Sequence, residues 1–176
     1  VTSGVSYLGY SSGSNGTVTV DGANSTWDLG LDSLTVGYNG NATLTVTNGG
    51  VVTSGDSYLG YNIYTNGTAT VDGANSTWNL GSGSLYVGYI GNSTFSQYAN
   101  GTLTISNGGE VISGEAYLGY GGGGIGNVTV NGANSTWDLG SGNLYVGNSG
   151  KGNLTISNGG NVTSGTAYVA DRKSVV

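Results

Sequence analysis

The sequence contains no cysteine, histidine, methionine or proline, and several of these absences narrow what the protein can do. Without histidine and cysteine, neither a Ser-His-Asp triad nor a thiol nucleophile can be assembled. Disulfide bonds are excluded as well. Only three residues are basic against nine acidic ones, so the net charge is −6 and the basic surface that binds nucleic acids is lacking.

Charge of either sign and long apolar runs are also scarce. Charged residues make up 7% of the chain, against about 25% in an average soluble domain. No apolar run approaches the ~18 residues that a transmembrane helix needs, so this segment is not expected to insert into a membrane. A cytosolic protein so poor in charge would be unusual.

What the sequence does have is glycine, tyrosine and β-branched residues. The 37 glycines, together with frequent asparagines, indicate many turns. The 13 tyrosines, with abundant valine and threonine, favour strands. We therefore expect short strands joined by frequent corners.

An internal repeat organises nearly the whole chain. The hexapeptide Gly-Ala-Asn-Ser-Thr-Trp occurs at residues 22–27, 73–78 and 132–137, at offsets of 51 and 59 residues. The unit is therefore 51 residues long, with eight extra residues inserted between residues 90 and 101. Each unit divides into two related halves, and each half carries three short alternating segments joined by Gly/Asn corners.

Such a repeat predicts a solenoid, because each half matches one triangular coil. We expect an all-β, right-handed parallel β-solenoid (β-helix) with three short strands per coil of about 25 residues, in about six full coils preceded by a partial one. It forms a single domain over residues 1–170. The tail Asp171–Val176 breaks the repeat and is interpreted as non-native or unstructured, for instance adapter-derived sequence ending a metagenomic fragment.

Alternation within the strands predicts three inward columns with one residue per coil. The first column is Val20, Val46, Val71, Ile105, Val130 and Ile156. The second is Val1, Leu29, Val52, Leu80, Val111, Leu139 and Val162, and the third is Leu8, Val36, Leu59, Val87, Leu118, Val146 and Val169. Three tryptophans are expected to be buried core residues, each facing a glycine of the next coil that makes room for the indole: Trp27 with Gly50, Trp78 with Gly109, and Trp137 with Gly160.

With the units laid out, the chain resembles the repeat proteins of type V secretion (autotransporter) passengers and PEP-CTERM-associated exported proteins. The resemblance is carried by the motifs at Val18–Leu29, Leu85–Tyr89 and Gly101–Gly109, and the match covers nearly all of Val1–Ala170. It implies a bacterial protein exported to the cell surface or the extracellular space, a passenger-type β-solenoid, and no catalytic residues. We expect this sequence to be a segment of such a protein, because no signal peptide, translocating barrel or sorting tail is recognised in it.

The acidic residues do not predict an enzyme or a metal site. Polysaccharide-cleaving solenoids need facing carboxylates, whereas the aspartates here are dispersed: Asp21, Asp28, Asp32, Asp56, Asp72 and Asp138. The glycine run Gly121–Gly126 superficially resembles a calcium-binding solenoid, but no aspartate follows at the required spacing, so a flexible corner is the preferred interpretation. We expect no catalysis, no metal and no cofactor.

A tyrosine ladder is predicted on the outward side of the third strand of each coil. Its members are Tyr7, Tyr58, Tyr86, Tyr117, Tyr145 and Tyr168, interrupted by Thr35. A companion column follows the next glycine: Tyr10, Tyr38, Tyr61, Tyr89 and Tyr120. Two interpretations stay open, namely structural stacking between coils and a contact surface for glycans or another rod.

A second outward ladder consists of threonine pairs on the first strand of each coil. Its members are Thr17, Thr19, Thr43, Thr45, Thr68, Thr70, Thr102 and Thr104, and the pairing is lost at Asn127 and Asn153. A flat Thr-x-Thr array resembles the face of ice-binding solenoids. The alternative is that threonine simply suits exposed strand positions.

The sequence as a whole predicts a structural stalk or scaffold segment of an exported, adhesin-like bacterial surface protein. The alternative is a binding module that uses the tyrosine ladder for surface glycans or the threonine face for ice. The insertion between residues 90 and 101 is expected to protrude, and its Phe95 and Tyr98 are candidates for a local contact. Unpaired rod ends are expected to allow end-to-end self-association.

Overall fold

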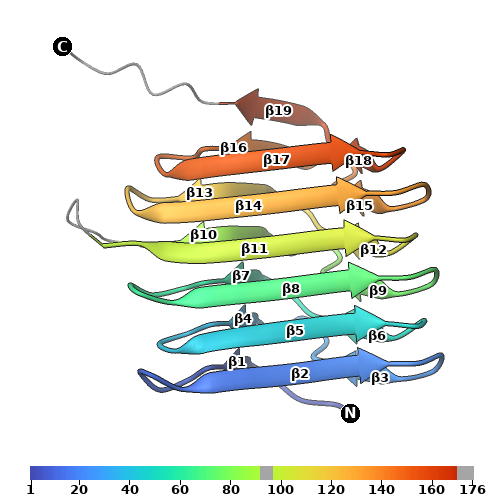
Figure 1. The fold of residues 1–176 in the computed structure, drawn as a ribbon, viewed down its shortest axis with the longest axis horizontal. Coiled ribbons are helices and arrows are strands. Elements are labelled where there is room, and N and C mark those ends of the chain that lie inside the picture. The colour runs from blue at the N-terminus through green and yellow to red at the C-terminus, as the bar shows by residue number, and fades with distance from the viewer. Residues whose placement is uncertain (92–96, 170–176) are drawn as a thin grey trace.

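A computed structural model describes residues 1–91 and 97–169 of the chain. In these residues 19 strands and no helix are formed, so that no described segment is a helix able to span a bilayer. The strands pair in parallel and wind into a rod whose coils are stacked one on the next (Figure 1). This confirms the predicted β-solenoid with three strands per coil, six coils and a preceding partial one.

Three parallel sheets run along the rod, and we name each after its most regular side chains. The Thr sheet contains β2 (Asn15–Asp21), β5 (Asn41–Thr47), β8 (Asn66–Asp72), β11 (Ala99–Ser106), β14 (Gly124–Asn131) and β17 (Lys151–Ser157). The Trp sheet contains β3 (Thr26–Asp28), β6 (Val51–Thr53), β9 (Thr77–Asn79), β12 (Glu110–Ile112), β15 (Thr136–Asp138) and β18 (Asn161–Thr163). The Tyr sheet contains β1 (Ser6–Leu8), β4 (Leu34–Val36), β7 (Ser57–Leu59), β10 (Leu85–Tyr89), β13 (Ala116–Tyr120), β16 (Asn143–Val146) and β19 (Thr166–Val169).

The core lies inside this triangle and consists of side chains from alternate strand positions. The column that begins Val20–Val46–Val71 and the column that begins Leu8–Val36–Leu59 pair in register along the rod, as predicted. Most of these residues are fully buried in the middle coils. Period-two alternation was enough to identify them because a parallel coil repeats the same inward positions.

The predicted second column is wrong by one inward position. Trp27 pairs with Val52, Val52 with Trp78, and the same register continues along the Trp sheet, so tryptophan and valine alternate in one column. Leu29 and Leu80 each lie two residues after a tryptophan, at the next inward position of the chain. They are buried in the coils on either side of Ser54. The small neighbour of each indole is therefore a serine and not a glycine.

Gly50, Gly109 and Gly160 have a different role from the predicted one. The corner that contains Gly50 has five residues between the inward Val46 and Val52, whereas the corner before Trp27 has six. In the shorter corner a Cβ on Gly50 would lie 2.3 Å from the carbonyl oxygen of Val20 in the preceding coil. Glycine is required there because the backbones approach closely, and alternating corner lengths produce the two-coil unit.

The tryptophans are buried as predicted, with exposed fractions of 9%, 0% and 0% for Trp27, Trp78 and Trp137. Their sequence neighbours Asp28 and Asp138 are exposed, while Asn79 is half-buried. Each indole Nε1–H donates to a serine hydroxyl of the preceding coil: Trp27 to Ser3, Trp78 to Ser54 and Trp137 to Ser113, at 2.9, 3.0 and 3.1 Å. A buried indole needs such an acceptor.

Candidate functional site

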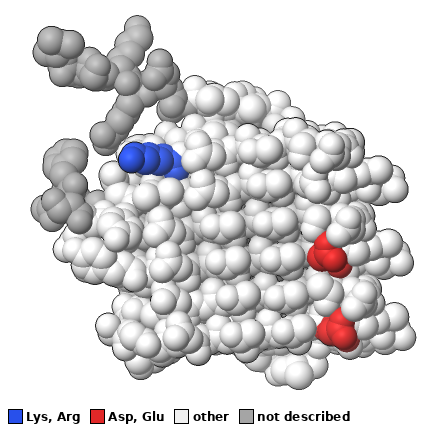
Figure 2. Space-filling model, viewed as in Figure 1, with Lys and Arg blue, Asp and Glu red and all other residues white. Residues whose placement is uncertain are grey.

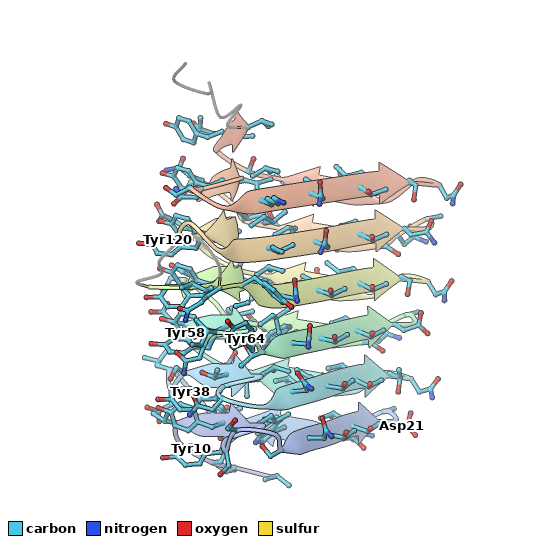
Figure 3. All side chains as sticks on the ribbon, turned by 60° about the vertical axis from the view of Figure 1, so that its left-hand side comes forward. Tyr10, Asp21, Tyr38, Tyr58, Tyr64 and Tyr120 are labelled. Atoms are coloured by element: carbon cyan, nitrogen blue, oxygen red, sulfur yellow. The ribbon has the colours of Figure 1, made fainter. Side chains whose placement is uncertain are left out.

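The two outward tyrosine columns lie side by side along the Tyr sheet. The Tyr column (Tyr7, Tyr58, Tyr86, Tyr117, Tyr145 and Tyr168) is in register from strand to strand, with Thr35 in the gap, as predicted. The companion column is Tyr10, Tyr38, Tyr61, Tyr89 and Tyr120. The labelled Tyr10, Tyr38, Tyr58 and Tyr120 follow one edge of the rod in Figure 3.

Rings within the Tyr column are stacked face to face. From Tyr58 to Tyr168, successive centroids are 4.8–4.9 Å apart and the rings are inclined by 2–8°. This separation matches the spacing of neighbouring strands, about 4.8 Å, so the backbone sets the stack. The companion column stacks less regularly, with centroids 4.9–5.5 Å apart.

Edge-to-face contacts join the two columns. Tyr86, for example, contacts both Tyr89 and Tyr120 with centroids 5.4 Å apart and near-perpendicular rings. At the gap, Tyr38 packs against Tyr7 at 4.8 Å, and Thr35 is buried at 2% exposure. The eleven rings of the two columns, which we call the Tyr network, therefore form one connected set.

Two phenol groups of the Tyr column have a hydrogen-bond partner two residues upstream. Tyr117 donates its hydroxyl hydrogen to Glu115 Oε2, and the amide of Asn143 donates to Tyr145 Oη at 3.4 Å. Burial raises the pKa of Tyr58 to about 12, with smaller contributions from Tyr86 and Asp56. Burial, and to a smaller extent the hydrogen bond to Glu115, raises the pKa of Tyr117. These phenols therefore stay protonated at neutral pH.

Stacking limits what the Tyr column can bind. A sugar ring packs on the face of an aromatic ring, but the faces of Tyr58, Tyr86, Tyr117 and Tyr145 are covered by their column neighbours. What reaches solvent is ring edges and hydroxyl groups. The geometry therefore favours structural stacking over a glycan platform along the interior of the column.

The predicted threonine face is formed by the outward side of the Thr sheet. Thr17, Thr43, Thr68 and Thr102 form one column, and Thr19, Thr45, Thr70 and Thr104 form the next. The first column continues into Asn127 and Asn153, which are joined by a side-chain hydrogen bond of 2.8 Å. All of these threonines are exposed or half-buried.

The Thr sheet is almost free of charge. Its six strands contain three charged residues, Asp21, Asp72 and Lys151, each at a strand end. Figure 2 shows this face, with acidic groups at one margin and a basic group near the opposite one. The face is a regular array of hydroxyl and amide groups with no charged centre.

Sequence reasoning missed two polar ladders beside the threonines. Asn41 Oδ1 accepts from Asn66 Nδ2 at 2.9 Å, and Asn66 Oδ1 accepts from Asn100 Nδ2 at 3.0 Å. At the other margin, Asp21 Oδ1 accepts from Thr47 and Asn48, which lowers the pKa of Asp21. The same arrangement recurs at Asp72 and Asn131. Column alignment at the 51-residue period would have identified both.

The dispersed carboxylates take part in local structure. Asp28 and Asp138 each accept a hydrogen bond from the backbone N–H two residues on, at 2.9 Å, and Asn79 does the same at 2.8 Å. Within residues 1–91 and 97–169, no three acidic side chains gather where they could hold a metal. Gly124–Gly126 belong to β14, so the glycine run is not simply a flexible corner.

Of the two loop candidates, Phe95 lies outside the described residues. Tyr98 is 48% exposed and contacts Tyr64 edge to face, with centroids 5.7 Å apart. The Tyr64 backbone N–H also donates to the Tyr98 carbonyl at 2.7 Å. This pair joins the corners of two successive coils.

Comparison with known proteins found a relative of this chain by sequence. No family model matches the chain, and neither does any solved structure. The chain is 35% identical over 172 residues to a protein of Escherichia coli (strain K12) named "Uncharacterized lipoprotein YdeK". The match covers 92% of this chain but spans only 12% of that relative's length.

Proposed function

We propose that this chain is a structural rod segment of an exported, adhesin-like bacterial surface protein, which spaces other parts from the cell and carries no catalytic activity. The observation that carries the proposal is the constant register of all three sheets through successive coils. A rod of this kind has a length set by its coil number. The lipoprotein relative supports a place at the bacterial surface, because that protein is much longer and named for a lipid anchor.

Non-catalytic function is supported by the use of the acidic groups. Asp21, Asp72 and Asp138 act as hydrogen-bond acceptors for turns and for neighbouring coils. An autotransporter or PEP-CTERM export route belongs to the same proposal and rests on the repeat motifs.

The spacer function is tested by changing the coil number. One 51-residue unit, for example residues 22–72, is duplicated in a chain fused between a lipoprotein anchor and a reporter epitope. We expect the anchor-to-reporter distance, measured by energy transfer on intact cells, to grow by two coil spacings, about 10 Å. An unchanged distance, or hydrolysis of surface polysaccharides by the chain, would contradict the proposal.

End-to-end association is a further part of this proposal. In the described residues, the outer edges of β17, β18 and β19 pair with no further strand, and Ile156 and Val169 are 49% and 76% exposed. A second copy could add its coils to this edge. Sedimentation velocity over a range of concentrations tests this, and a strictly monomeric chain would count against it.

Ice binding is a second candidate function. It is favoured by the two threonine columns, which are in register and carry no charge. Thermal hysteresis should be present and should disappear when Thr45 and Thr70 are both replaced by tyrosine. Absence of hysteresis in the unchanged chain would remove this candidate.

The glycan candidate predicts retention on a polysaccharide array that is lost in a Tyr86→Ala, Tyr117→Ala variant.

A further inference from the structure

The Tyr network is continuous over the whole described rod. Every ring is within 5.8 Å of another, centroid to centroid, and the contacts link Tyr7 and Tyr10 at one end to Tyr168 at the other. We propose that this network is a relay for one-electron oxidation, which passes an oxidised state between coils and holds it at Tyr117. Its partners are small diffusible one-electron oxidants and reductants.

Two features support the relay: neighbouring rings are in contact, and all of them carry the same phenol group. Electron transfer slows steeply with the distance between donor and acceptor, and neighbouring rings here are in van der Waals contact. All the groups are phenols. A hop from one phenoxyl to the next ring re-forms one O–H bond and breaks another, with both protons exchanged with solvent at the hydroxyl groups, so the two states are close in energy. At the position of Thr35, where the Tyr column is interrupted, Tyr38 contacts Tyr7 at 4.8 Å and Tyr61 at 5.4 Å and keeps the path closed.

Tyr117 is the end point because it has a base. A neutral phenol that loses an electron becomes a strong acid and must release its proton. The hydroxyl of Tyr117 donates to the carboxylate of Glu115, whereas Tyr145 faces the amide of Asn143, which takes up no proton. In the described part of the chain, Glu115 is the carboxylate hydrogen-bonded to a phenol of the network.

Oxidation of Tyr117 transfers one electron and one proton. The oxidant gains one electron, the O–H bond of Tyr117 breaks, the proton passes to Glu115 Oε2, and a neutral phenoxyl radical remains. A one-electron reductant in the medium then returns the electron, and Glu115 returns the proton. No bond to carbon changes.

The surroundings of Tyr117 protect the radical. Tyr86 and Tyr145 cover its two faces at 4.9 and 4.8 Å, and Tyr120 packs against it at 5.5 Å. Tyr10 and Tyr168, which are 62% and 51% exposed, are accessible entry points. The oxidised state thus forms first at exposed rings and is held at a ring whose faces are covered.

The relay is tested by oxidising the network from one end. The chain has no cysteine, so Thr166→Cys creates a single attachment site for a ruthenium tris(bipyridine) photo-oxidant next to Tyr168. We expect a flash to produce a tyrosyl radical, detected by transient absorption and electron paramagnetic resonance. Its spectrum should change with Tyr117→Phe, which identifies the Tyr117 radical. The yield of that Tyr117 radical should fall severalfold with Tyr145→Phe, which keeps a ring but interrupts the relay. An unchanged yield with Tyr145→Phe would overturn the relay.

The role of Glu115 is tested separately. Glu115→Gln should slow radical formation by roughly tenfold or more, since positioned bases commonly contribute at least that much. Glu110→Gln, on β12 in the Trp sheet, is the matched control and should leave the rate unchanged. Equal rates in both variants, with unfolding midpoints like that of the parent chain, would overturn the assignment of Tyr117 and Glu115.

Discussion

At the residue scale, the most constrained side chains are the indoles and the serines that accept from them. Trp78 and Ser54 are both buried, and the Nε1–Oγ distance is 3.0 Å. Ser54 also exchanges a hydrogen bond with Ser57 at 3.0 Å. The Ser54 hydroxyl is therefore in contact with both partners, and its loss leaves the buried N–H of Trp78 without an acceptor.

Ser54→Ala tests this pairing. We expect the free energy of unfolding to fall by about 1–3 kcal/mol, because the indole N–H of Trp78 keeps its desolvation cost and loses its partner. Urea denaturation measures the change. Ser141→Ala, at an exposed corner residue, is the control and should change little; equal effects of the two substitutions would contradict the role given to Ser54.

At the scale of the elements, alternating corner lengths determine how the Thr and Trp sheets join. The short corners contain the motif Asn-Gly-Gly, at residues 48–50 and 107–109. Asn48 and Asn107 adopt a φ of 52° and are followed by Gly49 and Gly108 at 85° and 88°. These left-handed conformations suit asparagine and glycine. The third residue of the motif is constrained by space and not by φ.

Gly109→Ala tests the short corner. A Cβ at this position would lie 2.3 Å from the carbonyl oxygen of Val71, so we expect a loss of about 1–3 kcal/mol, as for overpacking in a core. Gly4→Ala is the matched control, because its nearest atom would be Asp32 Oδ2 at 3.4 Å. Urea midpoints compare the two; equal midpoints would show that the backbones can separate at no cost.

At the scale of the whole molecule, the Tyr network makes the free energy of unfolding vary with pH in the alkaline range. Burial raises the pKa values of Tyr58, Tyr61, Tyr86 and Tyr117 above 10.0, so the folded state favours the neutral phenols. Their stabilising contribution is complete below pH 10 and is lost as the pH rises through the folded values, which for Tyr58 is about 12. Stability should therefore decline from pH 10 upward.

The measurement is urea unfolding at a series of alkaline pH values. Tyr58→Phe removes one of the titrating groups while it keeps a ring in the stack. The decline between pH 10 and about 12 should be shallower in this variant than in the parent chain. Parallel declines in the two chains would contradict the contribution of Tyr58.

The repeat in the sequence was sufficient to predict the solenoid, the coil number, two of the three core columns and both outward ladders. It could do so because a parallel coil places residues one repeat apart directly above each other, so sequence alignment and spatial alignment coincide. The register of the Trp sheet was decided only in three dimensions. The short corners hold five residues and the long ones six, and this difference shifted the alignment of Trp27 with Val52. Ring orientation was also a tertiary result. The spacing placed the tyrosines in columns, but only the structure shows that column neighbours cover each other's faces and that Glu115 lies at the hydroxyl of Tyr117.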